Sequence, residues 1–194
     1  MTNGYTIWFT GLRGAGKSTV ARLVERSLRA GGERAELLDD NVLRASLSRE
    51  LGVSREDRET HVRRVAFVAD LLSRNETVVV AAVVSPYRST RDEVRGLMDG
   101  RFVEVYVKAS IEECARRDKE GLYEKAFRGD IRSFTGVSAP YEEPLNPELV
   151  LDTEHEEPAM SAARVLAFID SLFGYLRREP PRALPAFRET WASR

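Results

Sequence analysis

The chain has 194 residues, a length that fits one domain with an ordinary hydrophobic core. Its formal net charge is -1, with 42% hydrophobic and 31% charged residues, which is typical of a soluble globular protein and excludes the broad basic surface that binds nucleic acid or anionic membranes. The longest apolar run, residues 78–84, is too short to span a bilayer, and the first residues lack the pattern of a signal peptide, so we expect a cytoplasmic protein.

The first predicted elements frame a glycine-rich loop. Residues 5–10 form an apolar run that predicts a buried strand, and residues 17–30 repeat apolar side chains along one helical face. Between them stands a complete match to G-x-x-x-x-G-K-[ST], Gly11-Leu12-Arg13-Gly14-Ala15-Gly16-Lys17-Ser18-Thr19. In that setting backbone N–H groups and the helix N-terminus cradle phosphates, Lys17 reaches the β- and γ-phosphates, and the Ser18 hydroxyl holds Mg²⁺. A glycine-rich turn that binds nothing is much the weaker interpretation.

The rest of the chain alternates strand and helix patterns. Further strands are predicted at 35–38, 77–84, 102–107 and 148–151, and apolar stripes through 62–72, 94–98, 111–117 and 162–176 predict helices. This alternation predicts a three-layer α/β fold with a mostly parallel five-stranded sheet. We assign residues 1–178 to this domain and 179–194 to a proline-containing tail, which is either extended and poorly ordered or docked on the body.

Ligands of parallel sheets bind beyond the carboxyl ends of the strands, so the residues there are the candidate site. Asp39-Asp40-Asn41 follow the second strand, Ser85-Pro86-Tyr87-Arg88 follow the third, and a charged segment covers 116–121. A phosphate loop by itself leaves kinase, nucleotide switch and motor open. The size argues against a motor, and the further motifs of a switch are not found.

A kinase needs a carboxylate for the acceptor, cations and a lid. Asp39 and Asp40 supply the carboxylate, and segment 116–121 is either a lid or a solvated loop. Arginine suits phosphate or sulfate oxygens because its planar fork matches them, and the candidates are Arg44, Arg58, Arg63, Arg64 and Arg88. His61 and His155 are expected to pack or to lie on the surface, although His61 is near the acceptor side.

Together these stretches resemble the adenylylsulfate (APS) kinases, which transfer the γ-phosphoryl group of ATP to the 3′-hydroxyl of APS. The resemblance covers about residues 5–153. Beyond the loop it rests on Ser85-Pro86-Tyr87-Arg88, Gly121-Leu122-Tyr123, Phe134-Thr135-Gly136 and Asn146-Pro147-Glu148-Leu149, which are specific to this family when taken together. It implies a P-loop kinase fold with a lid, ATP and Mg²⁺, and APS or a related small molecule as acceptor, and it leaves a homodimer open.

By position, the resemblance implies a role for each candidate residue. Those expected at ATP are Gly11, Arg13, Gly14, Ala15, Gly16, Lys17, Ser18, Thr19 and Arg117, with Ser18 at the metal. Those expected at the acceptor are Arg44, Arg58, His61, Val84, Ser85, Glu120, Leu122 and Phe134, with Phe134 stacked on the adenine. The catalytic candidates are Lys17, Asp39, Asp40 and Asn41, and residues 117–123 are expected to form the lid.

The chain departs from the family pattern on the acceptor side. The family reads Leu-Asp-Gly-Asp-Asn-Val-Arg where this chain has Leu38-Asp39-Asp40-Asn41-Val42-Leu43-Arg44. Asp40 therefore takes the position of a glycine, and Asn41 that of the aspartate that serves as base. An extended chain points Asp40 away from the side that Asp39 and Asn41 share, whereas a one-residue bulge brings it in. Val53 replaces a phenylalanine that sandwiches the adenine, His61 an asparagine, and Glu120 a lysine of the lid.

Three functions fit this pattern. The first, which we adopt, is an APS kinase in which Asp39 or Asp40 does the work of the base, because phosphoryl transfer depends mostly on positioning and electrostatics. The second is a related kinase that phosphorylates a different nucleotide or small-molecule acceptor. The third is a regulatory protein that binds nucleotide without turnover. Asn41 suggests it, because this residue stands in place of the aspartate that serves as base.

Overall fold

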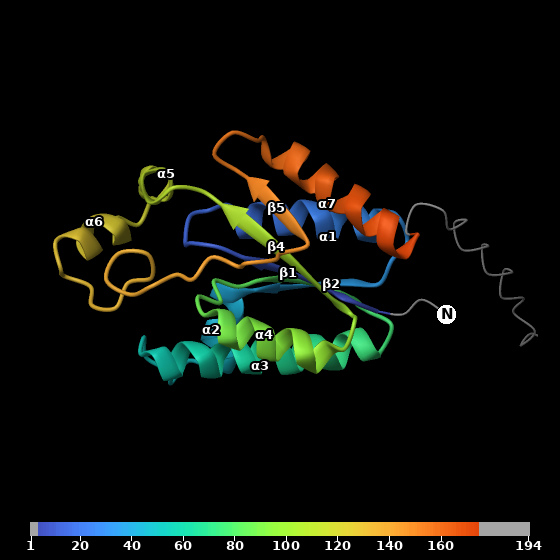
Figure 1. Ribbon diagram of the computed structural model, residues 1–194, viewed down its shortest axis with the longest axis horizontal. Coiled ribbons are helices and arrows are strands. Elements are labelled where there is room, and N and C mark those ends of the chain that lie inside the picture. The colour runs from blue at the N-terminus through green and yellow to red at the C-terminus, as the bar shows by residue number, and fades with distance from the viewer. Residues whose placement is uncertain (1–3, 175–194) are drawn as a thin grey trace, which may run out of the picture.

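The computed structural model describes residues 4–174 and shows a parallel sheet between two layers of helices (Figure 1). The strands are β1 (Thr6–Thr10), β2 (Ala35–Asp39), β3 (Val78–Ala82), β4 (Phe102–Lys108) and β5 (Leu149–Asp152). Their order in the sheet is β2-β3-β1-β4-β5, and every neighbouring pair is parallel. The predicted three-layer α/β fold is confirmed, while the tail at 179–194 lies outside the described residues.

Seven helices occur among the described residues, α1 (Lys17–Ala30), α2 (Asp40–Leu47), α3 (Arg55–Arg74), α4 (Arg88–Met98), α5 (Ile111–Arg116), α6 (Leu122–Phe127) and α7 (Pro158–Phe173). Helices α1 and α7 cover one face of the sheet and α3 and α4 the other (Figure 1). No helix in residues 4–174 is both long and apolar enough to cross a membrane.

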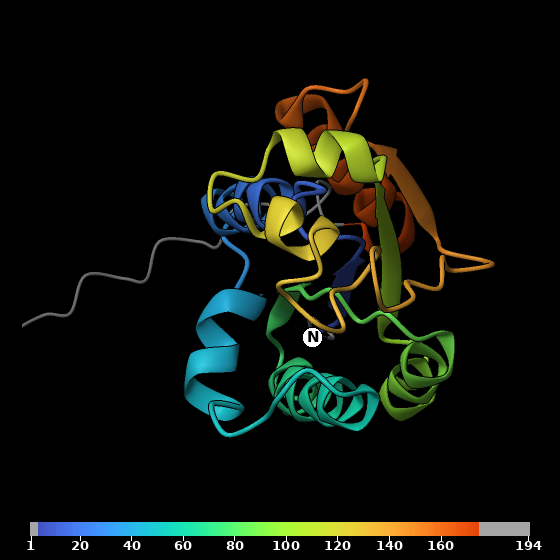
Figure 2. The same cartoon turned by 90° about the vertical axis from the view of Figure 1, so that its left-hand side faces the viewer.

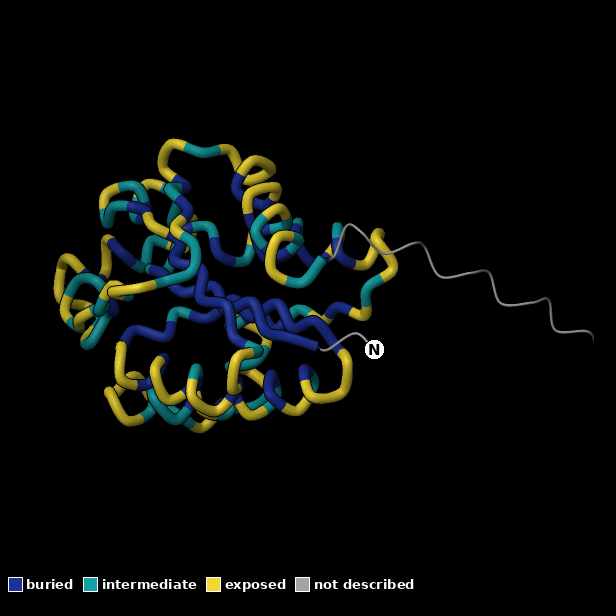
Figure 3. Tube along the Cα trace, turned by 45° about the vertical axis from the view of Figure 1, so that its right-hand side comes forward, coloured by how far each residue is buried: buried dark blue, intermediate teal, exposed yellow. Residues whose placement is uncertain are grey.

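The central strand β1 divides its side chains between two apolar clusters. Ile7 and Phe9 pack into the cluster of α1 and α7, whereas Trp8 packs into that of α3 and α4. All five residues of β1 are buried, as an apolar run without alternation predicts for a strand covered on both faces. The buried strands run through the middle of the molecule, and exposed positions lie on the outer helix faces (Figure 3).

Two short helices were not expected, and both begin near the carboxyl edge of the sheet. Helix α2 starts directly at the end of β2, because Asp39 accepts a hydrogen bond from the backbone N–H of Asn41 and so caps it. Helix α6 begins at Leu122, inside the expected lid, and continues past its end to Phe127. The third strand is also shorter than predicted, since β3 ends at Ala82.

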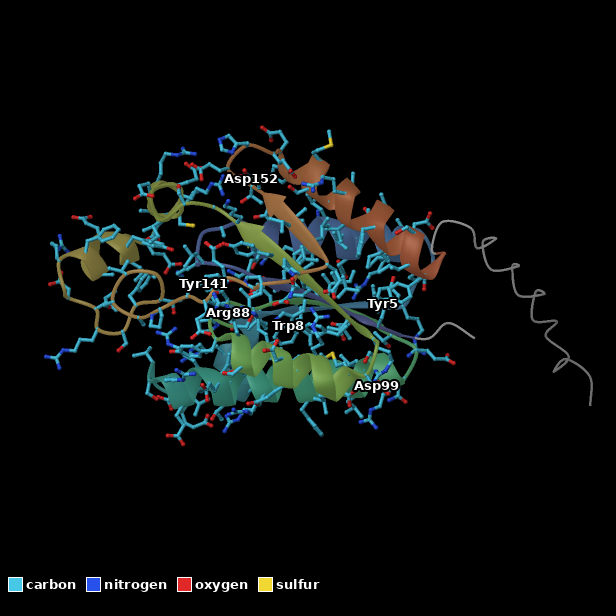
Figure 4. The ribbon with its side chains drawn as sticks, viewed as in Figure 1. Tyr5, Trp8, Arg88, Asp99, Tyr141 and Asp152 are labelled. Carbon is cyan, nitrogen blue, oxygen red and sulfur yellow. The ribbon has the colours of Figure 1, made fainter. Side chains whose placement is uncertain are left out.

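Figure 4 shows how the two ends of the sheet differ. Asp152 and Tyr141 lie at the carboxyl end of the strands, and Tyr5 and Asp99 lie at the opposite end. Helices α5 and α6 and the loop after them extend beyond the carboxyl end (Figure 1). The phosphate loop follows β1 at this same end, so any ligand on it meets the ends of β2 and β3.

Candidate active site

The phosphate loop joins β1 to α1 with a backbone that requires glycine. Gly11 has a φ of 149°, and a Cβ there would lie 2.3 Å from the carbonyl oxygen of Val107. At Gly14 (φ 83°) a Cβ would lie 2.9 Å from the carbonyl oxygen of Cys114. Gly16, at φ 98°, is the N-cap of α1, and no side chain of the described residues caps it. The N–H groups of the first helical turn are therefore free to bind an anion.

Lys17 is buried inside this loop at 7% exposure. Its Nζ donates hydrogen bonds to the carbonyl oxygens of Gly11 (3.0 Å) and Leu12 (2.8 Å). Burial lowers the pKa of Lys17 to about 8, although the attraction of Asp40 opposes this. The lysine is thus held by the loop itself, with an ammonium group that the surroundings only partly stabilise.

The two aspartates after β2 have different environments. Asp39 is buried and fully engaged, because it caps α2 and accepts a hydrogen bond from Nη2 of Arg22 at 3.1 Å. Asp40 is the first residue of α2 and lines the cleft beside Lys17 and Asn41. The extended geometry that would turn Asp40 away does not occur, because the chain is helical from this residue. The structure therefore favours Asp40 over Asp39 as the carboxylate that faces a ligand.

His61 explains how the Asp40 carboxylate stays ionised. Its Nε2 lies 2.7 Å from Oδ1 of Asp40. Burial by itself raises the pKa of Asp40, but the hydrogen bond and attraction of His61, together with the charge of Lys17, outweigh it and hold this pKa below its usual value. His61 was expected at the acceptor. It lies instead buried behind Asp40, with its Nδ1 2.8 Å from Oγ of Ser48.

A cleft of about 900 Å³ opens over the phosphate loop. Its walls come from the loop and α1, from the ends of β2 and β3, from the 113–123 segment and from residues 153–158 after β5. Among the predicted residues it includes Arg13, Gly14, Gly16, Lys17, Ser18, Thr19, Asp40, Asn41, Val84, Arg117 and Glu120. Most of the expected ATP residues are thus brought together at one place.

The 113–123 segment meets the phosphate loop directly. Glu120 Oε2 lies 3.0 Å from Nη2 of Arg13, and the hydroxyl of Tyr123 donates to the carbonyl oxygen of Arg13 at 2.7 Å. Arg117 donates to the carbonyl oxygen of Thr153 at 2.6 Å and pairs with Glu113. Glu120, expected at the acceptor, therefore contacts the phosphate-loop side of the cleft.

Other acceptor candidates gather around the loop that follows α6. Arg58 donates to Oγ1 of Thr135 at 2.6 Å and to the carbonyl oxygen of Ser133. The ring of Phe134 meets that of Tyr123 edge to face at 4.9 Å. Arg44 donates to the carbonyl oxygen of Gly52. Arg58 and Phe134 thus lie together, but neither they nor Arg44 and Leu122 line the cleft as it stands.

The position of Ser85 differs most clearly from the prediction that its side chain lies at the acceptor. Its side chain is buried at 1% exposure, where Oγ accepts from Nε1 of Trp8 at 3.0 Å and bonds to Oγ1 of Thr10 at 3.0 Å. Its carbonyl oxygen accepts from Nη1 of Arg91 at 2.6 Å. The residue has a positive φ of 39°, and its buried hydroxyl faces the core beneath the cleft and does not line it.

Several residues that line the cleft were not predicted as site residues. Thr153, His155 and Arg22 line the cleft, and Oγ1 of Thr153 donates to the carbonyl oxygen of Ala15 at 2.7 Å. The sequence could have indicated Thr153, because this residue directly follows the last strand, at the edge of the sheet where ligands bind. The candidate cations Arg63 and Arg88 are bonded to Glu93 and to the 142–143 loop, away from the cleft.

A phosphate loop on a parallel sheet, a buried lysine and a carboxylate at the next strand end define a P-loop small-molecule kinase. The family model for adenylylsulphate kinase matches residues 3–152. The chain belongs to the adenylylsulphate kinase family.

Relatives and solved structures agree with this assignment. The adenylyl-sulfate kinase of Rippkaea orientalis is 48% identical over 175 residues, covering 90% of this chain and 96% of that protein. That of Halothermothrix orenii is 47% identical, covering 89% and 92%. The structure of Mycobacterium tuberculosis APS kinase CysC in complex with AMPPNP and APS has a TM-score of 0.83 at 39% identity, covering 88% and 99%. A Sinorhizobium meliloti gluconokinase, at 18% identity and a TM-score of 0.58, shares the fold alone.

Proposed function

We propose that the chain transfers the γ-phosphoryl group of ATP to the 3′-hydroxyl of APS. The observation that carries this proposal is that Lys17 of the phosphate loop and the Asp40 carboxylate line the same cleft. One positions the transferred group and the other the acceptor, which are the two tasks of a phosphoryl-transfer site. The family membership supports the choice of APS, since the related M. tuberculosis enzyme was solved with both AMPPNP and APS.

On the donor side, the phosphates of ATP fit the uncapped start of α1. The loop N–H groups would bind the phosphate oxygens, and Lys17 would turn from the carbonyl oxygens of Gly11 and Leu12 to the γ-phosphate. Mg²⁺ also fits, because the Ser18 hydroxyl is a hard oxygen ligand in the cleft. Bound there, the ion would neutralise charge on the phosphates. Arg13 and Arg117 line the same wall and add positive charge.

On the acceptor side, Asp40 lines the cleft with a carboxylate, one oxygen of which is bonded to His61. It would orient the acceptor hydroxyl and accept its proton as the hydroxyl oxygen bonds to the γ-phosphorus and the bond to the β-phosphate oxygen breaks. Asp39 does not suit this role, because Arg22 and the N-terminus of α2 occupy it. Asn41 lies exposed at the rim of the cleft and would orient the hydroxyl without taking the proton.

Two isosteric substitutions test the proposal by release of ADP with APS as acceptor. Asp40→Asn should lower turnover by about 100- to 10,000-fold, because it removes the proton acceptor without changing side-chain size. Asn41→Asp should preserve or raise turnover, since it adds a carboxylate at the neighbouring position. Full activity in Asp40→Asn would reject the role of Asp40, and no turnover of APS by the unaltered chain would reject the function.

A kinase for another acceptor is the second candidate, and one observation favours it. Val53, where the family has an adenine-stacking phenylalanine, is 50% exposed, so one side of the expected adenine sandwich is missing. A panel of nucleotide and hydroxyl-bearing acceptors separates this reading from the first. Tight ATP binding with no turnover on any acceptor would instead support the regulatory protein.

A further inference from the structure

Helix α2 is held in place mainly by polar contacts. None of its 8 residues is buried, although Leu43 packs against the apolar cluster of α3 and α4. Helix α3 stands beside it (Figure 2) and supplies the polar contacts. Arg64 donates to the carbonyl oxygen of Leu47 at 2.5 Å, and His61 contacts the residues at both ends of α2. The position of the Asp40 carboxylate therefore depends on side chains of α3.

His61 joins the start of α2 to the residue just after its end. The imidazole is 3% exposed and lies between Asp40 Oδ1, 2.7 Å from Nε2, and Ser48 Oγ, 2.8 Å from Nδ1. Ser48 is the C-cap of α2 and is 1% exposed. Because an ionised carboxylate only accepts hydrogen bonds, Nε2–H donates to Asp40 and leaves Nδ1 for the serine hydroxyl. Both ring nitrogens are used within the protein.

We propose, building on the function proposed above, that His61 is a positioning residue that holds the Asp40 carboxylate toward Lys17 and the acceptor hydroxyl. Asp40 is not the capping residue of α2, so capping does not fix its side chain, and the bond to His61 is the side-chain restraint on it, beside a backbone hydrogen bond at Val84. A displacement of about 1 Å at a reacting group can cost about 100-fold in rate.

The two residues of this contact are both departures from the family pattern. Asp40 stands where the family has glycine, and His61 where it has asparagine. A glycine at position 40 would leave nothing for His61 to hold. On the function proposed above, the pair would supply the carboxylate from position 40, since position 41 holds an asparagine.

Comparison of two backgrounds tests this role. His61→Ala in the unaltered chain should lower kcat with APS by about 10- to 100-fold, with little change in the KM for ATP. The same change in the Asp40→Gly/Asn41→Asp background, which restores the family pattern, should cost less than about threefold, because no carboxylate remains at position 40. Arg63→Ala is the matched control, since Arg63 lies two residues further along α3 and pairs with exposed Glu93. An equal loss in both backgrounds would show a merely structural role and overturn the proposal.

A second measurement does not depend on turnover. In the protein without nucleotide, Asp40→Asn should shift the ring nitrogen and Nε2–H signals of His61 in NMR spectra, and Arg63→Ala should leave them unchanged. Unshifted His61 signals in Asp40→Asn would overturn the pairing. If the unaltered chain did not phosphorylate APS, the proposed function would fail, and these spectra would still decide whether His61 holds Asp40.

Discussion

Lys17 should take up a proton when nucleotide binds. Burial lowers its pKa to about 8, so about half of the molecules carry a neutral Lys17 at pH 8 and about one tenth at pH 7. Phosphate oxygens beside Nζ favour the charged form and raise this pKa again. Binding at pH 8 should therefore consume about half a proton per site. For the same reason the affinity for nucleotide should fall about fourfold between pH 7 and pH 8.5.

Calorimetry of AMPPNP binding in buffers with different ionisation enthalpies measures this uptake. Lys17→Arg is the control. Arginine keeps its charge throughout this pH range, so residue 17 of this variant should take up no proton when AMPPNP binds. Heats at pH 8 that do not depend on the buffer, or the same uptake in Lys17→Arg, would refute the reasoning.

The lowered pKa of Lys17 also predicts how the free energy of unfolding depends on pH. The unfolded chain binds more protons than the folded one between about pH 8 and 10.5, so Lys17 should make the free energy of unfolding rise with pH across this window.

Two further substitutions probe the acceptor side and the phosphate loop. Val53→Phe should lower the KM for APS by about 2- to 10-fold in steady-state kinetics, because it restores an aromatic stacking surface, whereas Leu97→Phe, at the same 50% exposure on α4, should not. Gly11→Ala should lower the free energy of unfolding in urea by about 1–3 kcal/mol, because its Cβ would meet the Val107 carbonyl, whereas Gly96→Ala, with nothing within 4 Å, should not destabilise the chain. An unchanged KM, or a neutral Gly11→Ala, would count against the respective argument.

The sheet and the donor side could be predicted from the sequence because their signals are local. The phosphate loop is a continuous motif between a buried strand and a helix, and the structure brings Lys17, Ser18 and Arg117 into one cleft as expected. The strand patterns are also local, since buried parallel strands are apolar runs with little alternation. The interactions that determine the structure of these segments therefore depend on residues within each segment.

The acceptor side could not be predicted in the same way, because its contacts join distant positions. Helix α2 has no buried residue that would have given it an apolar stripe, and it forms because Asp39 caps it and α3 holds it. Ser85 turns inward because Trp8, 77 positions away, binds its hydroxyl. His61 and Asp40 are 21 positions apart. Nothing in the neighbourhood of any one of these residues indicates its partner.

These contacts also change what the departures from the family pattern imply. Taken one at a time, Asn41, Asp40 and His61 suggest the loss of a catalytic base. Taken together, they leave a carboxylate beside Lys17 with a partner that holds it, so the chemical step need not be weakened. Val53 is different, because its side chain is exposed and carries no aromatic ring that could stack on a base. On the proposed function, Asp40, Asn41 and His61 concern the rate of phosphoryl transfer, which the pair of Asp40 and His61 would preserve, whereas Val53 concerns binding of the acceptor base. An enzyme built this way should keep kcat and lose affinity for the adenine of its acceptor.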